Sequence, residues 1–417
     1  MAGSDALASP NRIDAPDQVS PQVATNSYER ASLSARFAFR LLLKRAWWRC
    51  PRILRELPLR MLSLAFLPNR RSSNLIEEGP TFVVAPLSEA SGIGAGARLH
   101  ISQGMAGRRQ VRPVDMTPLF RKPDSSQCAF PTISIKEARS VLGPGTVVIH
   151  ANPPHCLIVL LSLGRKFLRH KKIVAYWVWE LDDIPSLWQF ALRFVDCIEV
   201  PSRFVAAAVA RHTSKPIAVI PHPVPKAVGH RRQFAEDGVT RVLFMFDMAG
   251  RISRKNPMAA IQAFKQAFGG RGNAIFTIKV SPSPGFEDEL TQFAELVSGE
   301  PSVVLLVTRL SPDEVDGLYA SHDIYLSLHR AEGYGLTIRE AIEHGLHVVA
   351  TGWSGNMDFM HGQRVHPVGC RLVAVTEDQD VFSVPDAKWA EPDIEQAAQV
   401  LSHIDRSERV RLQARRA

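Results

Sequence analysis

The sequence predicts an α/β protein with two parallel-sheet domains and a basic segment in front of them. Its 417 residues are more than one ordinary domain core accommodates. From about residue 80 onward, short apolar stretches alternate with stretches of helical spacing, an order typical of parallel sheets with right-handed crossovers. The net charge of +9 is concentrated in one segment near the N-terminus.

Composition restricts the class of protein. A hydrophobic fraction of 45% with 22% charged residues is ordinary for a globular chain. The longest apolar run, Cys156–Leu163, is shorter than the ~18 residues that a membrane span needs, and the polar N-terminus is not a secretory signal. The five cysteines are scattered and the histidines lack metal-ligand spacing, so we expect no disulfide framework and no metal site. These features predict a cytoplasmic protein.

The N-terminal part divides into two predicted segments. Residues 1–27 lack aromatic residues and hydrophobic periodicity, which predicts a disordered lead. Residues 28–75 form a predicted basic amphipathic helical extension, with eleven Lys or Arg against two Glu between Tyr28 and Arg71. Arginines at helical spacing beside Trp, Phe and Leu are typical of a helix on an anionic membrane surface. Peripheral association with the inner face of the cytoplasmic membrane through residues 28–72 is thus one hypothesis; a helix packed on the first domain is the other.

We expect no nucleic-acid partner, since a basic segment binds nucleic acid specifically only when a reader fold presents it, and the sequence shows none.

The first domain is predicted over residues 80–225. Ser202 is expected to cap a helix, residues 117–140 to be irregular, and the proline-rich stretch Ile217–Pro225 to cross to the next domain. The predicted strands are Thr81–Ala85, Val111–Met116, Thr146–Ala151, Lys172–Trp177 and Asp196–Pro201.

A glycine-rich loop is predicted after the first of these strands. Gly92 and Gly94 would let the backbone approach a sugar or an acceptor. Together with Ala97 they mimic a dinucleotide fingerprint, but Pro86–Ser91 separates them from the strand, which is too long for the tight turn of that motif.

The strand Lys172–Trp177 ends in the sequence YWVWELDD. Parallel sheets bind their ligands at this end of their strands, so Glu180 is a candidate for contacting an acceptor hydroxyl. The alternative is a surface acid beside two core tryptophans.

The second domain is predicted over residues 240–390, with a C-terminal helix over residues 391–417. Its first strand leads into a turn that carries Arg254 and Lys255. Two cations at a strand-to-helix turn suit a diphosphate, whose developing charge they neutralise. A solvent-exposed basic turn is the alternative.

The stretch Tyr325–Gly355 is predicted to be a strand, a glycine-containing loop, a helix and a second strand. Glu332 lies in the loop and Glu340 in the helix, so the two carboxylates flank the helix start. The free backbone amides there favour a diphosphate, and they belong to Gly335, Leu336 and Thr337. A nucleotide-sugar has hydroxyl groups on both sides of its diphosphate; an acidic first helical turn is the plain alternative.

These residues resemble the donor-site signature of retaining glycosyltransferases of the GT-B fold, family four. Glu332 and Glu340 match the E-x7-E pattern of that family, and Gly333 and Gly335 are also in place. The Arg254–Lys255 pair, followed by Asn-Pro, matches a second family motif. The sequence Y-W-x-W-E-L is similar to a subgroup that acts on bacterial polysaccharides, among them mannosyl- and glucosyltransferases.

The resemblance implies two Rossmann-like domains facing across a cleft, with a last helix that often returns to the first domain. It implies transfer of a hexose from a nucleotide-diphosphate sugar to a glycan or lipid-linked glycan, with retention and without a metal or other cofactor. Glu332, Arg254 and Lys255 would be catalytic, and Glu340 would bind the ribose. The alternative is a non-catalytic scaffold subunit of a membrane-associated polysaccharide assembly complex.

Overall fold

The computed structural model describes residues 52–70, 79–102, 110–128, 130–224, 227, 234–235, 237–269, 271–376 and 384–416. The predicted lead over residues 1–27 and much of the extension over residues 28–75 lie outside these ranges. The chain divides into two compact units, Met1–Arg55 and Glu56–Ala417, and nearly all of the described residues belong to the second. No helix among the described residues is long and apolar enough to cross a bilayer.

The first sheet is parallel and has seven strands in the order β3-β2-β1-β4-β5-β6-β7. Its central strands are buried on both faces because helices cover them, which explains their continuous apolar sequences. The strands are β1 (Thr81–Ala85), β2 (Val111–Asp115), β3 (Ile133–Ser134), β4 (Gly145–His150), β5 (Lys171–Tyr176), β6 (Cys197–Val200) and β7 (Ile217–Val219). The helices of this part are α2 (Arg52–Phe66), α3 (Gly92–Ser102), α4 (Ile135–Ser140), α5 (His155–Leu168), α6 (Ser186–Ala191) and α7 (Arg203–Ala210).

The glycine-rich stretch is a helix and not the predicted loop. Helix α3 begins at Gly92, and the Ser91 hydroxyl accepts a hydrogen bond from the Gly94 amide at 3.2 Å. A Cβ on Gly94 would lie 2.6 Å from the Pro86 carbonyl oxygen, and a Cβ on Gly96 would lie 2.2 Å from the His222 ring. Glycine is therefore needed here for close packing.

Two further predictions for the first part of the chain are wrong. Residues 133–140 are ordered as β3 and α4, because Ser134 and Glu137 form a reciprocal capping box. The stretch after Pro216 adds the short edge strand β7 to the sheet before it leaves the first part.

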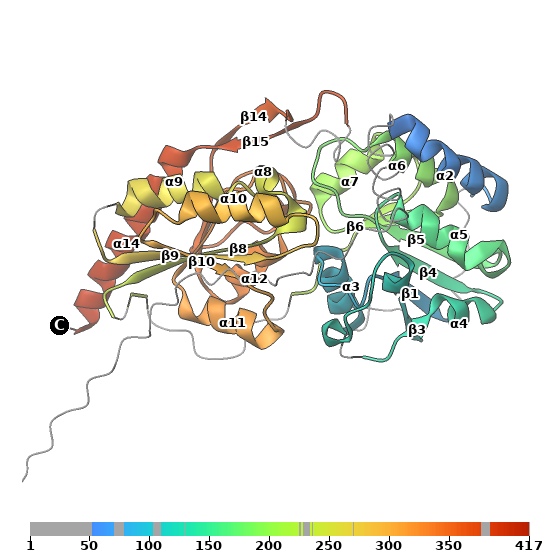
Figure 1. Cartoon of the computed structure of the whole chain (residues 1–417), viewed down its shortest axis with the longest axis horizontal. Helices are drawn as coiled ribbons and strands as arrows, with labels where there is room; N and C mark the ends of the chain where they lie inside the picture. The colour runs from blue at the N-terminus through green and yellow to red at the C-terminus, as the bar shows by residue number, and fades with distance from the viewer. Residues whose placement is uncertain are drawn as a thin grey trace, which may run out of the picture. The chain divides into compact units, whose positions relative to one another are not determined.

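The second sheet is also parallel and has six strands in the order β10-β9-β8-β11-β12-β13. These are β8 (Thr240–Asp247), β9 (Ala274–Ser281), β10 (Val303–Val307), β11 (Ile324–Ser327), β12 (His347–Thr351) and β13 (Val365–Val368). Helices α9 (Pro257–Phe268) and α10 (Glu287–Val297) lie on one face, and α11 (Pro312–Ser321) and α12 (Leu336–Glu343) on the other (Figure 1). Strand order reverses between β8 and β11, which is where such sheets bind ligands.

The C-terminal region differs from the expectation in two ways. Helix α14 (Ile394–Arg416) packs on α9, and its Ala397 and Leu401 belong to the core of the second sheet, so it does not return to the first. Strands β14 (Cys370–Ala374) and β15 (Lys388–Pro392) form an antiparallel pair that the sequence pattern did not predict.

Candidate functional site

The reversal of strand order in the second sheet brings three of the predicted site residues together. Arg254 and Lys255 close the short helix α8 (Ile252–Lys255) after β8, and Glu332 lies in the loop after β11. The Lys255 ammonium group donates a hydrogen bond to one carboxylate oxygen of Glu332. Nη1 of Arg254 lies 3.2 Å from the other oxygen. We call these three residues the carboxylate–cation cluster.

The backbone holds this cluster in place. Nη1 of Arg254 donates a hydrogen bond to the Ala331 carbonyl at 2.7 Å, and the Arg330 amide donates to the Arg254 carbonyl at 2.7 Å. The amide of Glu332 donates to the Ser354 hydroxyl at 2.8 Å. The two loops are thus fixed to each other by their main chains as well as by the ion pairs.

Burial and pairing act in opposite directions on the Glu332 carboxyl, of which 10% is exposed. Burial raises its pKa, but the nearby Lys255 and Arg254 more than offset this and lower the pKa to about 2. Burial also lowers the pKa of Lys255, and Glu332 opposes that shift. The cluster therefore contains a carboxylate and two cations, because a buried charge is stable only when it is paired.

Glu180 lies beside the carboxylate–cation cluster, although it follows β5 of the first sheet. Its carboxylate is 3.7 Å from Nη2 of Arg254. Burial raises its pKa, and Arg254 opposes the shift. The aromatic residues beside it are core residues: Trp177 is buried against Trp188, and the Trp179 indole donates to the Asp183 carbonyl at 2.7 Å.

The two predicted glycines of the loop between β11 and α12, Gly333 and Gly335, are required for different reasons. A Cβ on Gly333 would lie 2.6 Å from the Val178 side chain and 2.9 Å from the Trp179 carbonyl. Gly335 has φ +91° and directly precedes α12, where only glycine is unstrained. Leu336 and Thr337 are the first residues of this helix, so their amides lie at its positive end.

Glu340 has a separate environment within α12. The Tyr319 hydroxyl donates a hydrogen bond to the Glu340 carboxylate at 2.8 Å, and its oxygen lies 3.0 Å from the Thr337 carbonyl oxygen. Burial raises the pKa of Glu340 to about 7, although the Tyr319 hydrogen bond acts against the shift. Sequence reasoning missed Tyr319 because a fully buried tyrosine at helical spacing has the pattern of a core residue.

His329 is a second residue that sequence reasoning missed. It follows β11 and is fully buried, and neither ring nitrogen has a hydrogen-bond partner in the described part of the chain. Burial lowers its pKa to about 4, so its imidazole is neutral at ordinary pH. The charges of Glu332, Lys255 and Arg254 all act on it.

The two candidate glycines of the first sheet lie at the start of α3. Gly92 has open space around it, whereas Gly94 is packed against the Pro86 and Glu89 carbonyls. Their role toward an acceptor stays a prediction. The described residues contain no group of three or more His, Cys, Asp or Glu side chains arranged to hold a metal ion.

Comparisons with known proteins identify relatives. The sequence model for "Family 4 Glycosyltransferase in conflict systems" matches residues 202–416, just over half of the chain. A search of curated proteins finds no match.

Several solved structures are similar. Anabaena HepE in complex with UDP and glucose has a TM-score of 0.54 at 14% identity, over 78% of this chain and 89% of HepE. The outer core galactosyltransferase WaaB has a TM-score of 0.47 at 12% identity, over 68% of this chain and 83% of WaaB. The pneumococcal O-GlcNAc transferase GtfA has a TM-score of 0.44 at 14% identity, and the match spans 68% of this chain but only 53% of GtfA. The likeness to HepE shows a shared fold.

Proposed function

The chain belongs to the family 4 glycosyltransferases of conflict systems and has the GT-B fold, and we propose the donor, stereochemistry and site residues of its reaction. The donor is a nucleotide-diphosphate sugar that carries a hexose. The acceptor is a glycan or a lipid-linked glycan, and the anomeric configuration is retained.

The observation that carries this proposal is the carboxylate–cation cluster at the reversal of strand order. Arg254 and Lys255 supply two buried cations, and Glu332 supplies a carboxylate that is ionised at every ordinary pH. Beside them, α12 presents its first amides. A diphosphate satisfies the cations and the amides, while the carboxylate accepts a hydrogen bond from a sugar hydroxyl.

The transfer step follows from these groups. The bond between the anomeric carbon and the diphosphate oxygen breaks, and the acceptor oxygen bonds to the same face of that carbon. The departing diphosphate takes the acceptor proton, so the protein need not supply a covalent nucleophile. Arg254 and Lys255 stabilise the charge that develops on the leaving group, which is the usual function of cations at such a site.

The nucleotide end of the donor is assigned to Glu340. Its carboxylate is oriented by Tyr319 and would accept hydrogen bonds from the ribose hydroxyls. HepE was solved with UDP and glucose, so UDP-glucose is the first donor to test on this chain.

The membrane hypothesis for residues 28–72 falls largely outside the described residues. The part of it that the structure describes, helix α2, is considered in the next subsection.

The test combines donor binding with donor hydrolysis. Thermal unfolding in UDP-, GDP- and other nucleotide-sugars should show stabilisation by the correct donor, about 2.7 kcal/mol at a concentration of 100 times Kd. Glu332→Gln and the double change Arg254→Ala/Lys255→Ala should lower hydrolysis and transfer at least about 100-fold, as loss of a preorganised charge does.

The matched control is Lys265→Ala on α9, which removes an exposed cation that pairs with Glu300. It should leave activity unchanged. Wild-type activity in Glu332→Gln would overturn the site assignment. Absence of both hydrolysis and transfer with every donor would instead favour the non-catalytic scaffold.

A further inference from the structure

Helix α2 buries polar side chains against the protein and exposes apolar ones to solvent. Its inward face carries Glu56 and Ser63, which are both buried, and Leu59 contributes to the core of the first sheet. Its outward face carries Leu57, Met61 and Leu64, spaced to form one stripe along the helix, and 60% of Met61 is exposed. A surface helix normally buries its apolar stripe, so this arrangement indicates an interaction surface.

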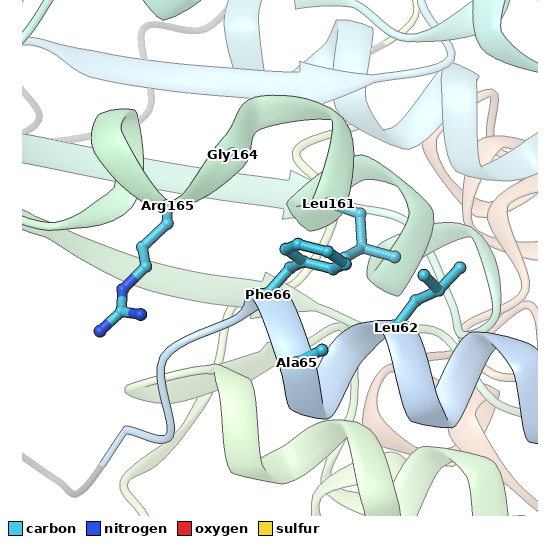
Figure 2. Close-up of a pocket in the computed structure, with 6 residues that line it drawn as sticks. All are labelled: Leu62, Ala65, Phe66, Leu161, Gly164 and Arg165. Atoms are coloured by element: carbon cyan, nitrogen blue, oxygen red, sulfur yellow. The ribbon is translucent and has the colours of Figure 1, made fainter.

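A groove continues this apolar surface toward helix α5. It has a volume of about 390 Å³, and Figure 2 shows Leu62 and Phe66 of α2 on one side with Leu161 of α5 on the other. Arg165 of α5 stands at the edge of the groove. Phe66 is 60% exposed. We call the stripe and the groove together the α2–α5 face. Removal of its apolar side chains from water is favourable.

The charge around the α2–α5 face has one sign. Neither Leu57–Arg70 nor His155–Lys172 contains an aspartate or glutamate. At the end of α5, the side chains of Arg165, Lys166 and Arg169 are exposed. Apolar side chains bordered by cations without carboxylates match a surface with an apolar interior and anionic headgroups.

A second copy of the chain fits this face less well. In a symmetric dimer both partners contribute the same patch, so the cations at the end of α5 would face the α2–α5 face of the other copy. No acidic residue in the two segments that form the face would compensate them. An anionic bilayer accommodates both the apolar stripe and the cations.

We propose that the α2–α5 face docks on the anionic leaflet of a membrane. Leu57, Met61 and Leu64 insert at the headgroup boundary, the groove takes up part of an acyl chain, and Arg165 with Lys166 contacts lipid phosphates. This face is formed independently of the carboxylate–cation cluster, so the proposal stands or falls separately from the enzymatic one.

The experiment is co-sedimentation of the full chain with vesicles of phosphatidylcholine, alone or mixed with phosphatidylglycerol. Wild type should sediment with the mixed vesicles and not with the neutral ones. Met61→Glu/Leu64→Glu should lower the partition coefficient about tenfold or more, because it removes two apolar side chains and adds repulsion. Arg165→Gln/Lys166→Gln should lower it several-fold and weaken the preference for anionic lipid.

The matched control is Leu296→Glu on α10, where an apolar side chain is 64% exposed outside this face. It should sediment as wild type does. The circular dichroism spectrum and the thermal unfolding midpoint should be unchanged in every variant, which verifies that they fold. Equal sedimentation of wild type and Met61→Glu/Leu64→Glu would overturn the proposal. Self-association that the double change abolishes, without vesicle binding by wild type, would assign the face to a second copy and would equally overturn it.

Discussion

Two carboxylates eight positions apart have opposite electrostatic environments. Glu332 contacts two cations, and its pKa is lowered to about 2, whereas Glu340 is buried and accepts a hydrogen bond from the Tyr319 hydroxyl, and its pKa is raised to about 7. The sequence pattern predicted both as site residues but could not distinguish them. The difference depends on which side chains the fold brings near each one, and Tyr319 in particular comes from α11, the helix that precedes α12 in the chain.

The pH dependence of donor binding should therefore come from Glu340 and not from Glu332. Protonation of Glu340 near neutral pH weakens it as the proposed acceptor for the ribose hydroxyls, so donor affinity should fall as pH decreases below about 7. Tyr319→Phe removes the hydrogen bond that favours the ionised form, which should move this midpoint to higher pH and raise the donor KM several-fold with a smaller effect on kcat. Calorimetric titration of UDP across pH measures the shift; an unchanged midpoint would contradict the role of Tyr319.

Stability gives an independent measure of the same group. Because the folded-state pKa of Glu340 exceeds its ordinary value of 4.5, its contribution is complete below the ordinary value and is lost as pH rises through about 7. Glu340→Gln should remove this loss, so its free energy of unfolding should decline less than that of wild type between about pH 5 and pH 8. Urea unfolding at both pH values provides the comparison.

At the scale of elements, the sequence predicted buried parallel strands well and glycine-containing segments poorly. Strands β1, β4 and β11 have continuous apolar sequences, because helices cover both faces of each sheet. Helix α3 was missed because its glycines disfavour helix by about 1 kcal/mol each, a cost that close packing of Gly96 against His222 outweighs. The β14–β15 pair is short and gives little periodic signal.

The backbone strain at the start of α12 can be tested by comparing Gly335 with Gly317 of α11, because replacement by alanine should have opposite effects on stability at the two positions. Gly335 has φ +91°, so Gly335→Ala should destabilise the protein by about 1–2 kcal/mol and displace the amides that we propose to bind the diphosphate. Gly317 lies inside α11 with open space around it, so Gly317→Ala should stabilise by about 0.5–1 kcal/mol and leave activity unchanged. Chemical denaturation with a donor assay on both variants makes the comparison. Equal effects would show that backbone strain at Gly335 is unimportant.

At the scale of the whole molecule, hydrogen bonds join the parts of the chain that contain the two sheets at the loop between β11 and α12. The Ser202 hydroxyl, which caps α7, donates to the Gly333 carbonyl at 2.7 Å, and the Tyr334 hydroxyl donates to the His222 carbonyl at 3.1 Å. Sequence reasoning assigned Ser202 as a helix cap and placed His222 within the crossing Ile217–Pro225, but contacts across the chain carry no local sequence signal. Glu180 adds a charged connection to Arg254.

Glu180→Gln should change both the affinity for UDP and the rate of transfer to the acceptor. Removing this carboxylate leaves Arg254 more positive, so UDP should bind a few-fold more tightly, measured at about pH 8, where ionised carboxylates prevail. Transfer to acceptor should fall if Glu180 binds an acceptor hydroxyl. Glu300→Gln, which removes the partly exposed partner of Lys265, is the matched control and should change neither quantity. An unaltered affinity for UDP would show that the ion pair has no influence on the donor.

The ion pair between Glu180 and Arg254 also limits how this enzyme can diversify. Under the proposed roles, a residue that selects the acceptor sets part of the charge that holds the donor. A substitution at position 180 that suits a new acceptor then alters the retention of nucleotide product, and so the rate of turnover. New acceptor specificities should therefore arise first at neighbouring positions that do not contact Arg254, and position 180 should change only together with the cation facing it.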